Sequence, residues 1–141
     1  RPDQAKLLRE TPREITNTAL EKFMRFDAPL HLFERTATAD TELGGVQIQE
    51  GQKIAALIGS ANRDETVFSA AETMDLTRDP NPHIGFGAGI HFCLGAPLAR
   101  LEMSVSLPAL WEKYPTMQLA ADPVRRPTFV LRGYESVAIS V

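Results

Sequence analysis

The chain has 141 residues, of which 43% are hydrophobic and 23% charged, the composition of a soluble globular protein large enough for one core. Fifteen Lys and Arg against eighteen Asp and Glu argue against a nucleic-acid-binding protein that relies on a basic surface. No apolar run approaches the ~20 residues that span a bilayer, and the single cysteine excludes an intrachain disulfide and any multi-cysteine metal site. The start at Arg1, without an initiator Met, is typical of a segment of a longer protein.

Two helices are predicted at the start of the chain. Residues 3–10 form a short helix with Asp3 as its cap. Residues 12–26 form a longer one, capped by Thr11 and ended by Pro29, because apolar side chains recur at helical spacing. The apolar residues of that stripe are Ile15, Ala19, Leu20, Phe23, Met24 and Phe26.

The next part of the chain has a β pattern. Strands are predicted over 32–38 and 46–48, with a turn at Gly44–Gly45, and the apolar run 53–58 indicates a buried strand. A short helix is expected over 61–66.

A long irregular segment, residues 68–92, follows. Repeated Gly and Pro interrupt any periodicity, and an ordered loop of this length is usually functional. A helix over 96–113 comes next, with Pro97 in its first turn and an apolar stripe of Leu98, Leu101, Val105 and Leu110. Residues 117–141 are expected to form short strands, with a turn at 132–134.

The lone cysteine, Cys93, belongs to the glycine-rich segment FGAGIHFCLG over 86–95, close before the predicted start of the long helix. A thiolate of Cys93 there would be stabilised by the free amides and the positive dipole end of the helix. Such a sulfur serves as a nucleophile or as a soft metal ligand, and Phe86 and Phe92 would give it an apolar wall. The alternative is a buried, inert cysteine, the usual state of a lone thiol.

This loop, continued through Leu98-Ala99-Arg100, resembles the haem-binding signature of the cytochromes P450, the haem-thiolate monooxygenases. The segments 35–38, 61–64 and 75–83 resemble the soluble bacterial branch, so nearly the whole chain is similar to the carboxy-terminal portion of that family. The resemblance implies an α+β segment of a mainly helical fold, with small β-sheets and a long helix after the cysteine loop. Residues 1–141 would be one unit, the haem-ligating part of a cytoplasmic enzyme.

By the same resemblance, Cys93 is the thiolate ligand of the iron of haem b (iron protoporphyrin IX). His91 and Arg35 match residues that bind the haem propionates, and Phe86 matches the aromatic residue beside the sulfur. The cofactor-binding set is therefore expected to be Arg35, Phe86, Gly87, His91, Cys93 and Gly95. The implied partners are a ferredoxin or flavoprotein electron donor, a small organic substrate and the missing amino-terminal part of the same enzyme.

One departure from the family pattern concerns a Glu-x-x-Arg pair on the helix 12–26 and a third, cationic member in the irregular loop. Arg25 matches the helix arginine, but Lys22 and Thr73 occupy the other two positions. Glu21 is about 100° around the helix from Lys22 and does not automatically replace the lost carboxylate, whereas Glu72 is a possible substitute from the loop. The departure predicts a loosened loop and weaker haem retention. The alternative is a solvated Glu21–Lys22 pair with no network.

Three functions follow from these patterns. The first is oxidation of an organic substrate by a monooxygenase that activates O2 at a cysteine-ligated haem. The second is a truncated or degenerate relative without catalysis, which binds haem weakly or not at all. The third is a cysteine-nucleophile enzyme that uses Cys93 and His91, which the lack of an orienting acid disfavours.

Overall fold

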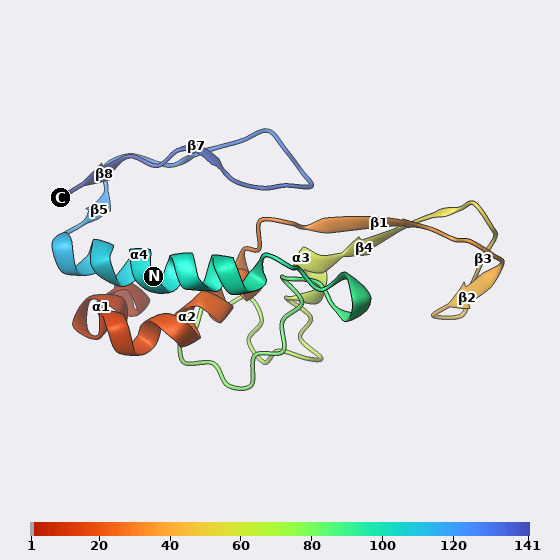
Figure 1. Cartoon of the computed structure of the whole chain (residues 1–141), viewed down its shortest axis with the longest axis horizontal. Coiled ribbons are helices and arrows are strands. Elements are labelled where there is room, and N and C mark those ends of the chain that lie inside the picture. Colours follow the sequence, from red (N-terminus) through yellow and green to blue (C-terminus); the bar gives the residue numbers. More distant parts are fainter. Residues whose placement is uncertain (1) are drawn as a thin grey trace.

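The computed structural model describes residues 2–141, and the side chains of Pro2, Ile15 and Thr16 lie outside that description. Three helices pack side by side at one end of the molecule: α1 (Pro2–Glu10), α2 (Pro12–Phe26) and α4 (Ala96–Lys113). An antiparallel ribbon of β1 (Leu32–Thr36) and β4 (Lys53–Leu57) leads away from them to the β2 (Thr41–Leu43) and β3 (Val46–Ile48) hairpin (Figure 1). The predicted mixture of helices and small sheets is therefore present.

The carboxy-terminal segment lies above α4 in Figure 1 as two small antiparallel pairs. One pair joins β5 (Gln118–Leu119) to β8 (Ile139–Ser140), and the other joins β6 (Val124–Arg125) to β7 (Tyr134–Ser136). An isolated bridge between Leu30 and Leu131 connects this segment to the residues after α2. The turn expected at 132–134 is wrong, because Tyr134 is already the first residue of β7.

The core is small and sits where the helices meet the irregular segment. Leu8, Ala19 and Leu76 are buried together, and Phe23, Met74 and Trp111 pack against them. The amide of Leu76 also donates to the side-chain oxygen of Gln4 in α1, over 2.8 Å. The segment 68–92, predicted to be irregular, contains one short 3-10 helix, η1 (Gly89–His91), and no other helix or strand; contacts of this kind order it instead.

Both predicted amino-terminal helices are confirmed, but their caps differ. Asp3 lies inside α1, which begins at Pro2. Thr11 occupies the N-cap position of α2, as predicted, but its side chain makes no capping hydrogen bond; its hydroxyl donates to the carbonyl oxygen of Leu7 in α1 over 3.2 Å instead. The predicted place of Ile15 in the apolar stripe of this helix lies outside the described side chains.

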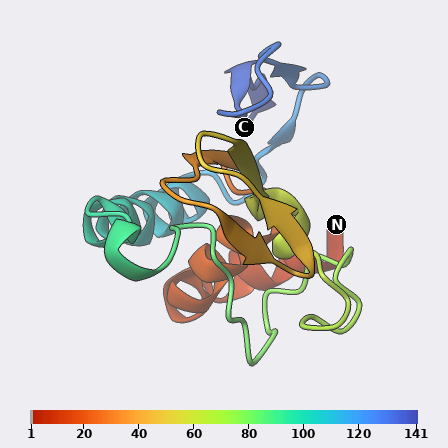
Figure 2. The ribbon, with the colours of Figure 1, turned by 90° about the vertical axis from the view of Figure 1, so that its right-hand side faces the viewer.

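Three expectations in the middle of the chain need correction. β4 is mostly exposed rather than buried, because it belongs to a two-stranded ribbon that extends away from the helices in Figure 1 and points toward the viewer in Figure 2. The short helix is α3 (Ile58–Ala61), which ends where the sequence placed its start. In α4 the bounds are confirmed, but Leu98, Leu101 and Val105 are exposed, whereas Ala96 and Pro108 are buried.

Within the described residues, no helix combines the length and the apolar character that crossing a membrane requires.

Candidate functional site

The cysteine loop folds back on itself immediately before α4. The amide of Cys93 donates to the carbonyl oxygen of Phe86 over 2.9 Å, and the amide of Ala96 donates to the carbonyl oxygen of Cys93 over 3.2 Å. Gly87 has a φ of 77°, and a Cβ there would lie 3.3 Å from the carbonyl oxygen of His91. A left-handed backbone so close to another carbonyl requires glycine, so the loop depends on the residue that the motif supplies.

Cys93 is exposed in this chain, so the alternative of a buried thiol is wrong. Its sulfur lies at the amino-terminal end of α4, because a Cβ added to Gly95, the residue before the helix, would be 3.7 Å away from it. The sulfur also borders an open hollow of about 310 Å³. The other residues that line this hollow are mainly apolar: Met24, Pro29, Leu30, Phe33, Gly85, Phe86 and His91.

A second hollow, of about 130 Å³, adjoins the first and shares Phe33 and His91 with it. Arg35 from β1 and Gly87 from the cysteine loop also line it. The fold therefore brings all six expected cofactor-binding residues into one region, with the sulfur in an apolar hollow and two nitrogen-bearing side chains in the next. Phe92 does not line either hollow; its ring lies 6.4 Å from that of Phe86.

A hydrogen-bonded network that the sequence did not reveal contacts the ring of Phe86. The carboxylate of Glu21 in α2 accepts hydrogen bonds from Nε and Nη2 of Arg100 in α4, over 2.5 and 3.1 Å. Its Oε2 also lies 2.7 Å from Nε2 of His83. The Arg100 guanidinium keeps the pKa of Glu21 below its ordinary value, and Glu21 raises the pKa of Arg100.

No signal in the sequence identifies Glu21 as part of this network. It lies before the last turn of α2, outside the region in which the helix dipole acts strongly on side-chain charges. The partner itself is not identifiable from the sequence, since Arg100 is 79 residues away.

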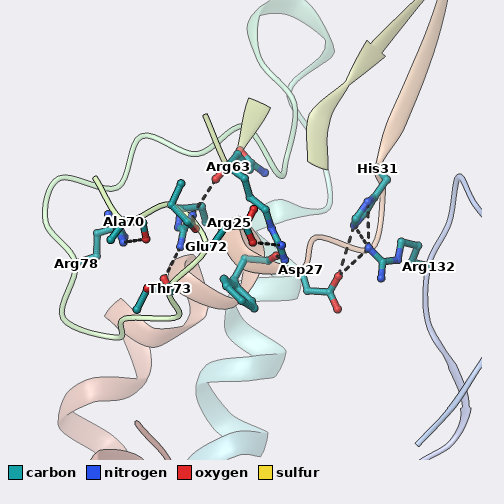
Figure 3. Close-up of polar contacts among 12 residues, drawn as sticks. Arg25, Asp27, His31, Arg63, Ala70, Glu72, Thr73, Arg78 and Arg132 are labelled. Carbon is teal, nitrogen blue, oxygen red and sulfur yellow. Dashed lines mark hydrogen bonds and ion pairs between the residues drawn. The ribbon is translucent and has the colours of Figure 1, made fainter. Parts of the chain in front are cut away.

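Arg25 holds the irregular segment against α2. It is 2% exposed, and Nη1 donates to the carbonyl oxygens of Asn62 and Ala71, both over 2.9 Å. Nη2 donates to the carbonyl oxygen of Thr73 over 3.0 Å (Figure 3). The segment is therefore fastened through its backbone, and these bonds do not require the missing carboxylate or the missing loop cation.

The replacement of the family's carboxylate and loop cation by Lys22 and Thr73 has a local consequence at Arg25. Lys22 is 7% exposed, and Nε of Arg25 is buried without a hydrogen-bond partner. Burial lowers the pKa of Arg25, and the nearby Arg78 and Arg63 lower it further. The possible substitute, Glu72, instead pairs with Arg63 over 2.7 Å (Figure 3). The alternative of a solvated Glu21–Lys22 pair is wrong, because Lys22 is buried and Glu21 binds Arg100.

Comparison with known proteins places this geometry in context. The family model for cytochrome P450 matches residues 11–129. The chain is 39% identical over 140 residues to the biotin biosynthesis cytochrome P450 of Bacillus subtilis (strain 168), covering 99% of this chain and 35% of that protein. It is 42% identical over 139 residues to the steroid C26-monooxygenase of Rhodococcus jostii (strain RHA1), covering 98% of this chain and 29% of the relative.

The fold matches as well. A crystal structure of P450BioI in complex with an acyl carrier protein ligated with hexadec-9Z-enoic acid superimposes with a TM-score of 0.95 and 38% identity. The match covers 99% of this chain and 36% of that one, and it confirms the expected α+β portion of a larger fold. The chain spans about a third of the length of these relatives.

Proposed function

Because this chain belongs to the cytochrome P450 family, we propose that it is the haem-binding, carboxy-terminal part of a monooxygenase, with Cys93 as the thiolate ligand of the haem iron. Residues 1–141 form this part as one unit. The observation that carries the proposal is the position of an exposed Cys93 sulfur at the start of α4, beside an apolar hollow. A thiolate at a helix amino terminus is a soft, electron-rich ligand of the kind that haem iron takes in this family.

The residues present fit haem b in both polarity and charge. The hollow beside Cys93 is mainly apolar, as the porphyrin plane requires. Arg35 lines the adjoining hollow and His91 lines both, and the nitrogens of these two side chains suit the propionate carboxylates. Gly87 and Gly95 keep the backbone free of side chains near His91 and the sulfur. When bound, haem supplies the oxidation chemistry, which inserts one atom of O2 into an organic substrate.

The contributions of this chain are ligation, orientation and burial. Phe86, 9% exposed, lines the same hollow as Cys93, and Arg35 and His91 from the adjoining hollow orient the cofactor by its charged edge. The remainder of the enclosure, the substrate and the electrons come from outside this chain. We expect a small organic substrate, a ferredoxin or flavoprotein donor, and a longer amino-terminal part that covers the other face of the haem. By analogy with its bacterial relatives, we expect the enzyme in the cytoplasm.

The test is spectroscopic. The purified chain is incubated with haem, reduced and exposed to carbon monoxide, and the thiolate type of Soret band is expected. Cys93→Ala should abolish the band, whereas a conservative change away from the site, such as Val137→Ala, should leave it intact. A chain that binds haem without this band contradicts thiolate ligation. Turnover is measured separately, on the longer enzyme with its electron donor. The band without donor-dependent turnover in that enzyme identifies a haem-binding, non-catalytic relative.

A further inference from the structure

The carboxylate of Glu21 joins three separate elements beneath the cysteine loop. Arg100 approaches it from α4 with two nitrogens, and His83 approaches it from the irregular segment. The side-chain amide of Asn81 also donates to the backbone carbonyl of Glu21, over 3.1 Å. His83 is almost completely buried, with 5% of its side chain exposed.

The hydrogen bonds of His83 fix its tautomer and link Glu21 to the loop backbone. The amide of Gly85 donates to Nδ1 of His83 over 3.1 Å, so Nδ1 must be the unprotonated nitrogen. Nε2 then carries the proton and donates it to Glu21. A continuous path of two hydrogen bonds thus connects α2 to Gly85, the residue directly before Phe86.

Both partners of Glu21 also contact the ring of Phe86. The guanidinium carbon of Arg100 lies 4.7 Å from the centre of the ring, and the imidazole of His83 lies 6.2 Å from it. A cation over an aromatic face stabilises the ring in place. The backbone carbonyl oxygen of Phe86 in turn accepts the hydrogen bond from the amide of Cys93.

The loop has little room to shift relative to α2 at this point. A Cβ at Gly85 would lie only 2.6 Å from the carbonyl oxygen of Met24, so the backbone already approaches the helix closely. Because the packing here is close, a change in the contacts of Glu21 with Arg100 and His83 is expected to shift Phe86.

We propose that Glu21 is a positioning residue for the Cys93 sulfur: through Arg100 and His83 it fixes Phe86 and the turn that carries the ligand. The inference deepens the proposed function and rests on it for the role of Cys93 as haem ligand. Glu21 does not touch the sulfur, and its effect is exerted through the two side chains that contact the Phe86 ring.

The first test is amide hydrogen exchange in the full chain without haem, comparing wild type, Glu21→Gln and Glu112→Gln. Glu112 is a matched control, because it also pairs with an arginine across α2 and α4, with Arg13 Nε at 2.5 Å and Nη2 at 2.8 Å. Glu21→Gln should accelerate exchange at the amides of Gly85 and Cys93 by at least about tenfold, as expected for the loss of a hydrogen-bonded charge. Glu112→Gln should leave both amides unchanged.

If the Glu21–Arg100 pair only stabilised the packing of α2 against α4, Glu21→Gln would give a different exchange pattern. If Glu21→Gln accelerates exchange throughout α2 and α4 but not selectively at Gly85 and Cys93, or has no effect, the inference is overturned. Should Glu21→Gln fail to fold, His83→Phe keeps the ring and removes both hydrogen bonds, and it should accelerate exchange at the same two amides.

The second test uses the haem-loaded chain. Glu21→Gln should shift the reduction potential and the Soret maximum of the carbon monoxide complex, whereas Glu112→Gln should match wild type. An unshifted potential and Soret maximum in Glu21→Gln, with the thiolate band present, overturns the positioning role. Absence of the thiolate band in wild type overturns the proposed function instead, and the exchange experiment still measures the effect of Glu21 on the loop.

Discussion

Arg25 donates a hydrogen bond to the backbone carbonyl of Thr73 over 3.0 Å, although Thr73 occupies the position where the family pattern has a cation. A backbone acceptor is available whichever side chain stands at position 73. The loop thus keeps its attachment to α2, and the lost partners leave Nε of Arg25 without an acceptor.

Replacement of Lys22 by glutamate should repair this defect. A carboxylate three residues before Arg25 on the same helix face can reach Nε, so Lys22→Glu should raise the free energy of unfolding by about 1–3 kcal/mol. Urea unfolding measures the change. Lys22→Met keeps the buried side-chain stem without adding an acceptor and should give a smaller gain.

The loop cation should help only when that carboxylate is present. Thr73→Arg alone adds charge beside Arg25, Arg63 and Arg78, and should lower the melting temperature, whereas Lys22→Glu with Thr73→Arg should raise both melting temperature and haem occupancy. If the double variant leaves both unchanged, the departure at Lys22 and Thr73 has no bearing on cofactor retention.

Ala70 adopts a left-handed backbone conformation, with a φ of 49°. The turn is held in this state because the carbonyl oxygen of Ala70 accepts from the amide of Thr73 over 2.9 Å and from Nη2 of Arg78 over 3.2 Å (Figure 3). Ala70→Gly removes the Cβ clash and should stabilise the chain by about 0.5–1 kcal/mol, measured by thermal unfolding. Ala99→Gly, within α4, should instead destabilise it by a similar amount.

The Glu21 network should make stability sensitive to acid. The pKa of Glu21 is lowered in the folded state, chiefly by Arg100, so the unfolded chain takes up its proton first as pH falls. The stabilisation is complete above the unfolded pKa of about 4.3 and is lost as pH falls through the lower folded value. Unfolding free energies from pH 7 to pH 3 should therefore decline more steeply for wild type than for Glu21→Gln, and parallel curves would contradict this linkage.

His31 should produce a second dependence at higher pH. Its pKa is lowered by burial and then by Arg132, whose Nη1 lies 3.1 Å from Nε2 of His31, while Asp27 opposes the shift (Figure 3). The unfolded chain then binds the proton more readily, so stability should fall as pH drops below the unfolded pKa of about 6.5. His31→Gln should flatten the difference in unfolding free energy between pH 7.5 and pH 5.5; an unchanged difference would show that His31 does not titrate on unfolding.

The sequence by itself determined the features that depend on near neighbours. The helix over 96–113 has the predicted bounds, because Gly95, Pro97 and the following residues carry local start signals. The cysteine loop was identified for the same reason, since its glycines and Cys93 lie within ten residues of one another. The resemblance to a family came from that loop, and the family comparison confirms it.

Only the tertiary structure decided what the charged and apolar side chains contact. Glu21 meets Arg100 across 79 positions of sequence, and Arg25 meets Thr73 across 48, and no local pattern specifies such partners. The exposure of β4 likewise depends on where its ribbon stands relative to the helices, not on its apolar composition. Backbone conformation is governed largely by short-range sterics and hydrogen bonding, whereas burial and side-chain pairing depend on which distant segments fold together.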